Sequence, residues 1–373
     1  MADELSTRRG TTTAPDPETA VKELAAQLYQ PGMKFVLLFA SADYDLPRLA
    51  EELRRQIPCP VYGCTTAGHI GPHGLEPRGI GATSFAGGAL EVVPFHVRAL
   101  GQCMGALSDV GRAVQSALEA QSDSRKAFVL TFVDGLARAE ERLVSALYRS
   151  IGDLPIVGGS AGDGLRFERT HVLVDGEFVS DAAAILLVRT SLPFVPFNVH
   201  HFEPTSRRLI VTRAHPDERV VHELNGERAS HAYAEALGLR PEQLDDRVFL
   251  DHPLILSVQG EPFVRSVRSV HPDGSMTFFC ALEDGLVLSV GTARDPEACL
   301  RETFAGIERS IGKPEIVIGF DCVVRRREFD ARGWTERIGR LYADHGMVGF
   351  STYGEQYNAL HLNQTLTGVA VAR

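Results

Sequence analysis

The segment Met347-Val348-Gly349-Phe350-Ser351-Thr352-Tyr353-Gly354 runs from a short apolar stretch into a turn made of glycines and hydroxyl side chains. Glu355, Gln356 and the block His361-Leu362-Asn363-Gln364-Thr365 follow closely. Glycine allows the backbone to turn tightly and to approach a ligand. Because polar side chains this dense beside a strand must be hydrogen-bonded or exposed, the segment predicts either the lining of a pocket or a tightly bonded turn.

Two earlier segments repeat the order of elements around this turn. In each, an apolar strand is followed by a helix and by a short strand that runs into glycines. Strand–helix–strand order indicates parallel strands joined by a right-handed connection. In the first unit, the strand is 34–39, the helix 45–56, the short strand 60–62 and the turn 63–68. In the second unit, these four elements are 127–132, 139–150, 155–157 and 158–164. In the third unit, they are 315–320, 334–344, 347–348 and 349–354.

The sequence therefore predicts an α/β fold built from repeated strand-helix-strand units, each carrying one glycine turn. These turns would lie at the C-terminal ends of parallel strands, where open α/β sheets bind ligands. Asp45 and Pro47 support the helix of the first unit, because aspartate caps a helix and proline fits its first turn. Residues 1–19 are expected to form a disordered lead-in, since they are charged and bury nothing, and a first helix is expected over 21–29.

Between the second and third units the sequence is mostly of β type, with one helix at about 230–237. Turn signals at Asn225-Gly226, Asp273-Gly274 and Asp284-Gly285 separate several of the strands. A boundary near residue 204 divides an α/β N-terminal half from a β-rich C-terminal half. The expected strands are 197–202, 209–214, 220–224, 248–258, 262–270, 276–282 and 286–290.

Charge and composition limit the partners and the compartment. The chain of 373 residues has 38 Lys and Arg against 48 Asp and Glu, which gives a net charge of −10. An acidic chain is not expected to bind nucleic acid, and we expect Arg325-Arg326-Arg327 to be a solvated strand end. The polar N-terminus is no secretory signal, and the apolar run 182–188 is too short to span a membrane. We expect a soluble, cytoplasmic protein.

Motifs for several common chemistries are missing from the sequence. The six cysteines form no C-x-x-C pair, which argues against a zinc ribbon or a thioredoxin-type site and fits reduced thiols. The turn 158–164 lacks the G-x-G-x-x-G spacing, and no G-x-x-x-x-G-K occurs, so nucleotide binding has no support.

At the level of families, the chain resembles the FIST proteins, which are sensory or signal-transduction modules. The turns 63–68 and 157–163 are similar to the FIST N-terminal domain. The segments 211–214, 223–226 and 349–355, with Asn363-Gln364-Thr365, are similar to the FIST C-terminal domain. The resemblance implies a lead-in and first helix over 1–30, a FIST N-terminal domain over 31–204 and a FIST C-terminal domain over 205–373.

Within that family, several segments resemble the bacterial nitric-oxide-sensing haem proteins of the NosP group. The resemblance implies a haem b (iron) protein whose nitric oxide-bound state regulates a partner histidine kinase in two-component signalling. One departure is His69, where an acidic residue would be expected. A monomer and a homo-oligomer both stay open. The segments that carry the resemblance are 43–46, 134–136, 201–205, 264–267, 278–281, 321–326 and 361–365.

Haem iron is most often held by a neutral histidine nitrogen, and the chain has 13 histidines. His361 lies in the polar block near the C-terminus, His201 alternates with Phe202 on an expected strand, and His252 precedes an apolar run. These three are the candidate metal ligands, in that order. The alternative for each is an ordinary hydrogen bond at a strand end. Cys59-Pro60 also resembles a haem-regulatory pair that could supply a thiolate.

The glycine turns supply the candidate ligand-binding residues. An alternative to haem is a small metabolite, such as an amino acid, bound at these same turns. A third class, a thiol enzyme with Cys64 as nucleophile and Glu355 and His361 as acid and base, is weaker because the three turns share no nucleophile, and we expect no enzyme. Asp163 and Glu355 can instead hold the loops together. The candidate ligand-binding residues are Cys64, Thr65, Ser160, Asp163, Ser351, Tyr353, Glu355 and Asn363.

Overall fold

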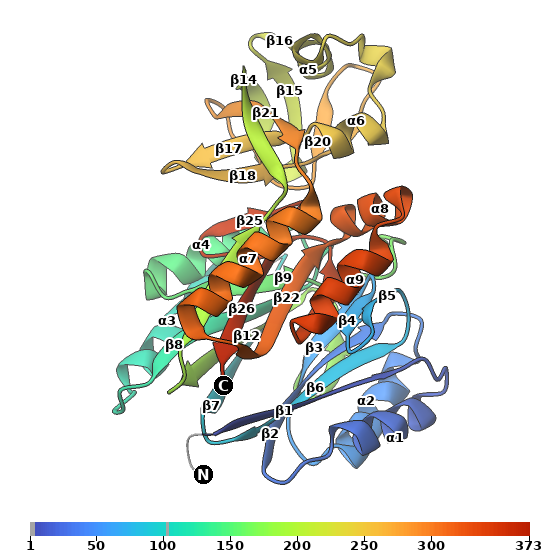
Figure 1. Cartoon of the computed structure of the whole chain (residues 1–373). Helices are drawn as coiled ribbons and strands as arrows, with labels where there is room; N and C mark the ends of the chain where they lie inside the picture. Colours follow the sequence, from blue (N-terminus) through green and yellow to red (C-terminus); the bar gives the residue numbers. More distant parts are fainter. Residues whose placement is uncertain (1–3, 102–103) are drawn as a thin grey trace. The chain divides into compact units, whose positions relative to one another are not determined.

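The computed structural model describes residues 4–101 and 104–373, which divide into two compact units (Figure 1). Unit 1 contains Met1–Asn198, Glu302–Leu360 and Leu366–Arg373. Unit 2 contains Val199–Arg301 and the five residues His361–Thr365. The chain therefore enters unit 2 once for about a hundred residues and again for the polar block near its C-terminus.

Unit 1 consists of three repeats with one order of elements, which extends the predicted strand-helix-strand unit at both ends. Each repeat begins with a strand and a helix, continues with the predicted unit, and ends with a short hairpin and a long strand. The first repeat comprises β1 (Leu5–Thr12), α1 (Pro17–Leu28), β2 (Met33–Ser41), α2 (Leu46–Gln56), β3 (Val61–Thr66), β4 (His69–Gly71), β5 (Gly74–Glu76) and β6 (Ile80–Gly87).

The second repeat follows the first directly, whereas the third is interrupted in sequence by the main segment of unit 2, between β13 and α7. The second repeat comprises β7 (Leu90–Arg98), α3 (Met104–Glu119), β8 (Lys126–Val133), α4 (Glu140–Ile151), β9 (Ile156–Ser160), β10 (Val172–Val174), β11 (Glu177–Val179) and β12 (Ala182–Thr190). The third comprises β13 (Phe194–Val199), α7 (Pro296–Ile311), β22 (Pro314–Cys322), α8 (Val323–Arg332), α9 (Thr335–Asp344), β23 (Met347–Thr352), β24 (Glu355–Tyr357), β25 (Leu360–Leu362) and β26 (Leu366–Ala372).

Each repeat forms a sheet that is completed by the hairpin of another repeat. The strand orders are β1-β6-β2-β3-β10-β11, β7-β12-β8-β9-β24-β25 and β13-β26-β22-β23-β4-β5. The central pairs β2–β3, β8–β9 and β22–β23 are parallel, which confirms the predicted α/β units. The hairpin β4–β5 of the first repeat joins the third sheet, β10–β11 joins the first, and β24 joins the second. The three repeats therefore cannot separate without breaking strand pairs.

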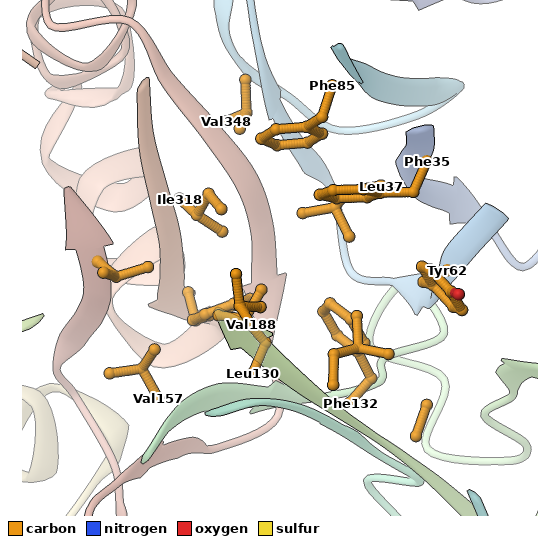
Figure 2. Packing of buried hydrophobic residues seen from close by; sticks show 14 of the residues in the cluster. Phe35, Leu37, Tyr62, Phe85, Leu130, Phe132, Val157, Val188, Ile318 and Val348 are labelled. Carbon is orange, nitrogen blue, oxygen red and sulfur yellow. The ribbon is translucent and has the colours of Figure 1, made fainter. Parts of the chain in front are cut away.

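The inner faces of the three sheets share one aromatic core (Figure 2). Phe39, Phe132 and Phe320 occupy the same place in β2, β8 and β22, opposite Cys64, Gly159 and Phe350 in the paired strands. The ring centroids lie 5.8 Å apart for Phe39 and Phe132 and 6.1 Å apart for Phe132 and Phe320. Such tilted and edge-on contacts stabilise a core beyond the burial of apolar area. One residue type at one register position thus builds the centre of unit 1.

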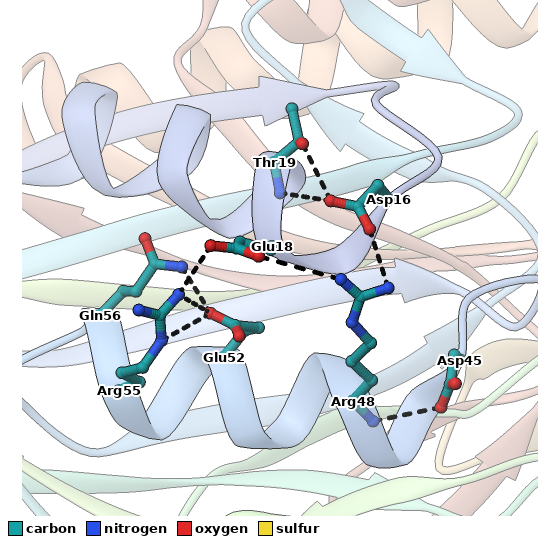
Figure 3. A network of polar contacts seen from close by, with 8 residues as sticks. All are labelled: Asp16, Glu18, Thr19, Asp45, Arg48, Glu52, Arg55 and Gln56. Carbon is teal, nitrogen blue, oxygen red and sulfur yellow. Dashed lines mark hydrogen bonds and ion pairs between the residues drawn. The ribbon is translucent and has the colours of Figure 1, made fainter.

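Helices cover the outer faces of the sheets, and two of them, α1 and α2, begin at an aspartate that caps the helix. Asp45 accepts a hydrogen bond from the backbone N–H of Arg48 at 3.2 Å, which confirms the predicted start of α2. Asp16 caps α1 and also pairs with Arg48 at 2.9 Å (Figure 3). Arg55 reaches Glu52 at 2.6 Å in the same network. Except for Glu52, these side chains are well exposed, so solvent screens the pairs and they add little to stability.

Unit 2 is β-rich, as predicted for this region, and it contains the predicted helix α5 and a second short helix, α6, that was not predicted. Its strands pair antiparallel around the long strand β14 (Phe202–His215), in the order β18-β17-β21-β14-β15-β20-β19, with β16 beside β15. Asn225 and Gly226 both have positive φ, which confirms that turn. The remaining elements are β15 (Val220–Leu224), β16 (Glu227–Arg228), α5 (Ala229–Leu237), α6 (Asp246–Asp251), β17 (Leu254–Val258), β18 (Glu261–Arg265), β19 (Val267–Val270), β20 (Met276–Phe278) and β21 (Val287–Ala293).

The expectation of a disordered lead-in is wrong for Leu5–Thr12. This segment is strand β1, paired with β6 from Leu5 opposite Gly87 to Thr12 opposite Ile80. Buried and exposed residues alternate only in part along this strand, so the sequence has no clear strand pattern here. The strand expected over 248–258 is also wrong at its start, because Asp245 caps the short helix α6 there.

The expectation of a solvated strand end at Arg325-Arg326-Arg327 is wrong as well. These residues lie in helix α8, and the Arg325 side chain is 1% exposed. Its Nε donates to Oδ1 of Asp321 at 2.7 Å, and the Tyr342 hydroxyl donates to Oδ2 of the same carboxylate at 2.9 Å. Burial alone would lower the pKa of Arg325, but Asp321 and Tyr342 raise it above its usual value. The guanidinium stays charged inside unit 1.

Candidate functional site

The three glycine turns of unit 1 meet and bond to one another through their backbones. The first and third turns exchange two hydrogen bonds: the Ala67 N–H donates to the Ser351 carbonyl at 3.2 Å, and the Ser351 N–H donates to the Gly68 carbonyl at 2.8 Å. The strands β3 and β23 are longer than predicted, because the first four residues of each expected turn, 63–66 and 349–352, are still strand. The chain turns just after them, at the C-terminal end of each strand. The backbone polar groups of the two turns are therefore satisfied by each other.

The second turn closes the ring. The Gly162 N–H donates to the Thr65 carbonyl of the first turn at 3.0 Å. The Ser160 N–H donates to the Gly354 carbonyl at 2.8 Å, and the Tyr353 N–H returns a bond to the Ser160 carbonyl at 3.1 Å. The tertiary structure thus brings together Thr65, Ser160, Ser351 and Tyr353 from three distant segments.

Glycine is needed in this ring because the turns approach closely. A Cβ on Gly159 would lie 2.5 Å from Cγ2 of Thr352 and 2.9 Å from the Phe350 ring. A Cβ on Gly162 would lie 2.8 Å from the Ala67 nitrogen. The room that the glycines create is filled by neighbouring turns. Of the two predicted roles, this arrangement corresponds to the tightly bonded turn.

Polar side chains beneath the ring form a buried network. Nε2 of Gln356 donates to the Ser160 hydroxyl at 3.0 Å, and that hydroxyl donates to Glu140 at 3.4 Å. The Thr131 hydroxyl donates to Oε1 of Gln356 at 3.4 Å. All four side chains are buried. Glu140 and Thr131 were missed by sequence reasoning, because neither lies near a glycine turn and only the fold brings them there.

Asp163 holds the second turn in shape. Its carboxylate accepts hydrogen bonds from the backbone N–H groups of Phe167, Glu168 and Arg169 at 2.8–2.9 Å, and another from the Tyr353 hydroxyl. Burial would raise the pKa of Asp163, but the bonds from Tyr353 and the three N–H groups outweigh it and lower the pKa. A carboxylate with four donors has little capacity left for a ligand, so its geometry is that of a loop-holding residue.

Three further turn residues are fully buried. Glu355 accepts a hydrogen bond from the Thr352 hydroxyl, and the Thr65 hydroxyl accepts one from the His171 N–H at 3.0 Å. The Ser351 hydroxyl has no hydrogen-bond partner among the described residues. Within this ring, Ser351 is therefore the turn residue with an unused hydroxyl.

Cys64 belongs to the aromatic core and not to the ring. Its thiol is fully buried in the cluster that contains Phe39 and Phe350, and burial raises its pKa well above the usual value. A nucleophilic cysteine needs a lowered pKa and access to substrate. Both properties oppose the thiol-enzyme alternative and give Cys64 a packing role.

The block His361–Thr365 belongs to unit 2, where side chains and backbone hold it. Nη1 of Arg265 donates to the His361 carbonyl at 3.4 Å, and the Ser266 hydroxyl donates to Oε1 of Gln364 at 2.7 Å. Nε2 of Gln364 donates to the Leu250 carbonyl at 3.2 Å. Arg265, another residue that sequence reasoning missed, is 5% exposed. The block therefore has a buried cation beside its histidine.

Asn363 differs from its neighbours in that block. Its side chain is fully buried, yet neither its Oδ1 nor its Nδ2 has a hydrogen-bond partner among the described residues. A buried amide without partners costs free energy, and such groups often mark a bound ligand or water. Asn363 is therefore the turn-associated residue whose hydrogen-bonding capacity is entirely unused.

The other two candidate histidines also lie in unit 2. His201 is fully buried, and its ring packs on Phe202 with a centroid separation of 4.2 Å. His252 is partly exposed, and its Nδ1 lies 3.3 Å from the Gly291 carbonyl, while its own carbonyl accepts a bond from Tyr233. His252 thus has the ordinary strand-end contacts that were its alternative role.

Two remaining sequence features lie in unit 1. His69 is buried with its Nε2 2.9 Å from the Thr11 hydroxyl and 3.4 Å from Glu76. Cys59 is half-buried, and burial raises its pKa to about 11, which opposes a thiolate at neutral pH. Among residues 4–101 and 104–373, no group of three or more His, Cys, Asp or Glu side chains could hold a metal ion, although haem needs only one histidine. In the same described ranges, no helix is long and apolar enough to cross a membrane.

Two family models match this chain. The FIST N domain matches residues 34–227, and the FIST C domain matches residues 229–358. A protein of Methanocaldococcus jannaschii, named "Uncharacterized protein MJ1623", is 33% identical over 106 residues. That match covers 28% of this chain and only about a fifth, 20%, of the relative's length. Because the FIST N model alone spans more than half of the chain, the protein belongs to the FIST family of sensory and signal-transduction proteins.

Proposed function

We propose that this FIST protein is a haem-based nitric oxide sensor of the NosP type that regulates a partner histidine kinase. The observation that carries the proposal is the buried His361, located beside the guanidinium of Arg265. A neutral imidazole is the commonest protein ligand of haem iron, and an arginine suits the two carboxylates of a haem. His361 and Arg265 are therefore residue types that suit the iron and the carboxylates of a haem b.

Within this proposal, His361 is the axial ligand and His201 the alternative. Both are buried histidines of unit 2, and His201 packs on an aromatic ring, as an imidazole in an apolar site would. When bound, the haem would supply an iron that takes up nitric oxide. The protein's own part is to hold the imidazole, to place Arg265 and to exclude water.

The chain path offers a route for the signal. Residues 361–365 are bracketed in sequence by β24 and β26, which belong to unit 1. A displacement of His361 is therefore covalently linked to two strands of the repeat structure. A kinase would be regulated to the extent that it binds one of the resulting conformers more tightly than the other.

The test is an absorption spectrum of the purified protein reconstituted with haem, in the ferrous state, with and without nitric oxide. The expected result is a stoichiometric Soret band that shifts with nitric oxide. The Soret band should be lost or displaced in His361→Ala. It should be unchanged in His231→Ala, a control at an exposed histidine of unit 2. If His201→Ala alone removes the band, His201 is the ligand. The haem proposal fails if no specific haem binding is found.

A second candidate function is supported by Asn363. A haem-free sensor that binds a small polar metabolite, such as an amino acid, would use the donor and acceptor that Asn363 leaves unpaired. The test is a thermal-shift screen of the twenty amino acids on haem-free protein. A ligand that raises Tm in the wild type and not in Asn363→Leu would support this function. A flat screen together with a haem band would leave haem as the ligand.

A further inference from the structure

Two neighbouring cavities in unit 1 lie at the start of β3, at the opposite end of that strand from the glycine turn. One has a volume of about 280 Å³ and is lined mainly by apolar groups, among them Leu53, Val61 and Leu173. The other has a volume of about 410 Å³ and is lined by Lys34, Arg125 and others. Ligand pockets commonly measure about 300–1,000 Å³. The first cavity is slightly smaller than this range, and the second lies near its lower end.

The two cavities share a wall made of Pro60 and Tyr62. Their opposite wall comes from β7, the edge strand of the second sheet, which contributes Val92 to the larger cavity and Pro94 to the smaller one. Proline is tolerated in an edge strand, where its missing N–H breaks no ladder bond. The cavities are therefore adjacent, with Tyr62 lining both, and we name the pair the Tyr62 groove, at the junction of the first and second repeats.

Tyr62 is the polar group at the middle of this groove. Its side chain is 8% exposed, and its ring packs on Phe35 with a centroid separation of 6.3 Å. Figure 2 shows the hydroxyl oxygen at the outer side of the core cluster. Among residues 4–101 and 104–373, no hydrogen bond reaches that hydroxyl, and its oxygen is not fully buried, so a ligand in the groove can contact it. Burial raises the pKa of Tyr62, which keeps the hydroxyl protonated as a donor.

The charged groups of the groove favour an anion at one end. The larger cavity is lined by two cations, Lys34 and Arg125, and one carboxylate, Glu91, which lies 3.3 Å from Arg125. In the part of the chain that the structure describes, Lys34 forms no ion pair. The smaller cavity has one cation and one carboxylate, Arg54 and Asp175, so it adds no net charge. The charged groups that line the two cavities therefore have an excess of one positive charge, although the net charge of the whole chain is −10.

We propose that the Tyr62 groove binds a small amphipathic carboxylate, such as an aryl- or alkyl-carboxylic acid. Its apolar body fills the cavity lined by Leu53, Val61 and Leu173. Its carboxylate lies at the shared wall, where it accepts hydrogen bonds from the Tyr62 hydroxyl and the Lys34 ammonium. This site is separate in sequence from the block 361–365, so it does not depend on the proposed haem or metabolite site.

The groove can be tested with 4-phenylbutyrate as the probe and 4-phenyl-1-butanol as its uncharged counterpart, using calorimetric titration of the full chain. We expect saturable binding of the carboxylate and about tenfold weaker binding of the alcohol. Tyr62→Phe removes only the hydroxyl and should weaken binding about tenfold, the usual effect of a hydrogen bond to a charged group. Lys34→Gln should weaken it about twofold to fivefold, because Lys34 is exposed.

Matched controls separate the groove from the rest of the surface. Tyr148→Phe and Lys126→Gln change the same residue types at exposed positions outside both cavities and should leave the affinity unchanged. Cys59, which lines the smaller cavity, reports on occupancy. With the carboxylate bound, its alkylation at pH 9, followed by peptide mass spectrometry, should slow at least threefold, as expected for a mostly occupied site.

Three outcomes would overturn the proposal. They are equal affinity for the carboxylate and the alcohol, unchanged affinity in Tyr62→Phe, and unprotected Cys59 at saturating carboxylate. If Tyr62→Phe fails to fold, Cys59→Met takes its place, since the longer side chain narrows the smaller cavity and should abolish binding. Full affinity in that folded variant would likewise contradict the proposed position of the apolar body.

Discussion

Gly63 and Gly349 occupy the same position in the first and third repeats of unit 1. Their φ angles are 150° and 151°, a region that residues with a side chain rarely adopt. A Cβ on Gly63 would lie 1.7 Å from the Leu38 carbonyl oxygen, and a Cβ on Gly349 would lie 1.7 Å from the Gly319 carbonyl oxygen. Each glycine thus allows the neighbouring parallel strand to approach closely within the β2–β3 or β22–β23 pair.

Gly63→Ala should therefore destabilise unit 1 severely. Strain and overlap at one site together cost about 3 kcal/mol or more of the free energy of unfolding. The chain has a single tryptophan, Trp334, which belongs to unit 1, so its fluorescence in a urea titration follows this unit. Gly32→Ala is the control, because Gly32 has positive φ but open space around it, and it should cost only about 1 kcal/mol. Equal losses in the two variants would refute the close-approach argument.

Asp163→Asn should loosen the loop 163–169. Its amide group cannot accept all the hydrogen bonds that the two carboxylate oxygens accept from Phe167, Glu168 and Arg169. Hydrogen exchange of those three amides should be faster than in the wild type. Asp16→Asn, the same change at the helix cap of α1, should leave them unchanged.

The same loop should depend on pH in the wild type. The folded pKa of Asp163 lies below its unfolded value, because the donated hydrogen bonds outweigh burial. Its contribution to stability is therefore present above the unfolded pKa and is lost as the pH falls through the folded one, that is, below about pH 4. After correction for intrinsic exchange rates, the loop should open in that range in the wild type. A similar pH response in Asp163→Asn would assign it to another group.

Arg325→Met should cost about 3–5 kcal/mol, because it leaves the Asp321 carboxylate buried without its cation. The triple variant Asp321→Leu with Arg325→Met and Tyr342→Phe should recover most of that loss, since it also removes the hydroxyl that bonds Asp321 and apolar groups often replace a buried pair at little cost. Arg340→Met breaks an exposed pair with Glu336 on α9 and should change the free energy of unfolding by less than about 0.5 kcal/mol. Urea titrations followed by Trp334 fluorescence measure all three. A small loss in Arg325→Met would contradict the buried pair.

Cys64 should behave as a core residue. In the folded protein, iodoacetamide should modify Cys59 well before Cys64, whose thiol is fully buried. Cys64→Val should keep stability within about 1.5 kcal/mol, whereas Cys64→Ser should lose about 1–3 kcal/mol because it buries a hydroxyl among aromatic rings. Rapid modification of Cys64 at neutral pH would reopen the thiol-nucleophile alternative.

The sequence determined the elements whose signals are local. Apolar runs, the Asp45 cap and the glycine turns predicted the three strand-helix-strand units and the antiparallel region with its Asn225-Gly226 turn. These features depend on residues within about a dozen positions, and one chain segment contains all the information that they need. The resemblance among the three turns also pointed to their shared position at the ends of parallel strands.

Only the tertiary structure decided which distant segments complete each other. The pairing of β1 with β6, the exchange of hairpins among the three sheets and the burial of Arg325 against Asp321 depend on partners that no local pattern specifies. The same holds for the candidate site: Cys64 faces the core and Asp163 holds its own loop, while the Asn363 amide has no partner among the residues that the structure describes. The physical reason is that the partners of a side chain are set by long-range strand register, whereas sequence spacing fixes only the face of the element on which it lies.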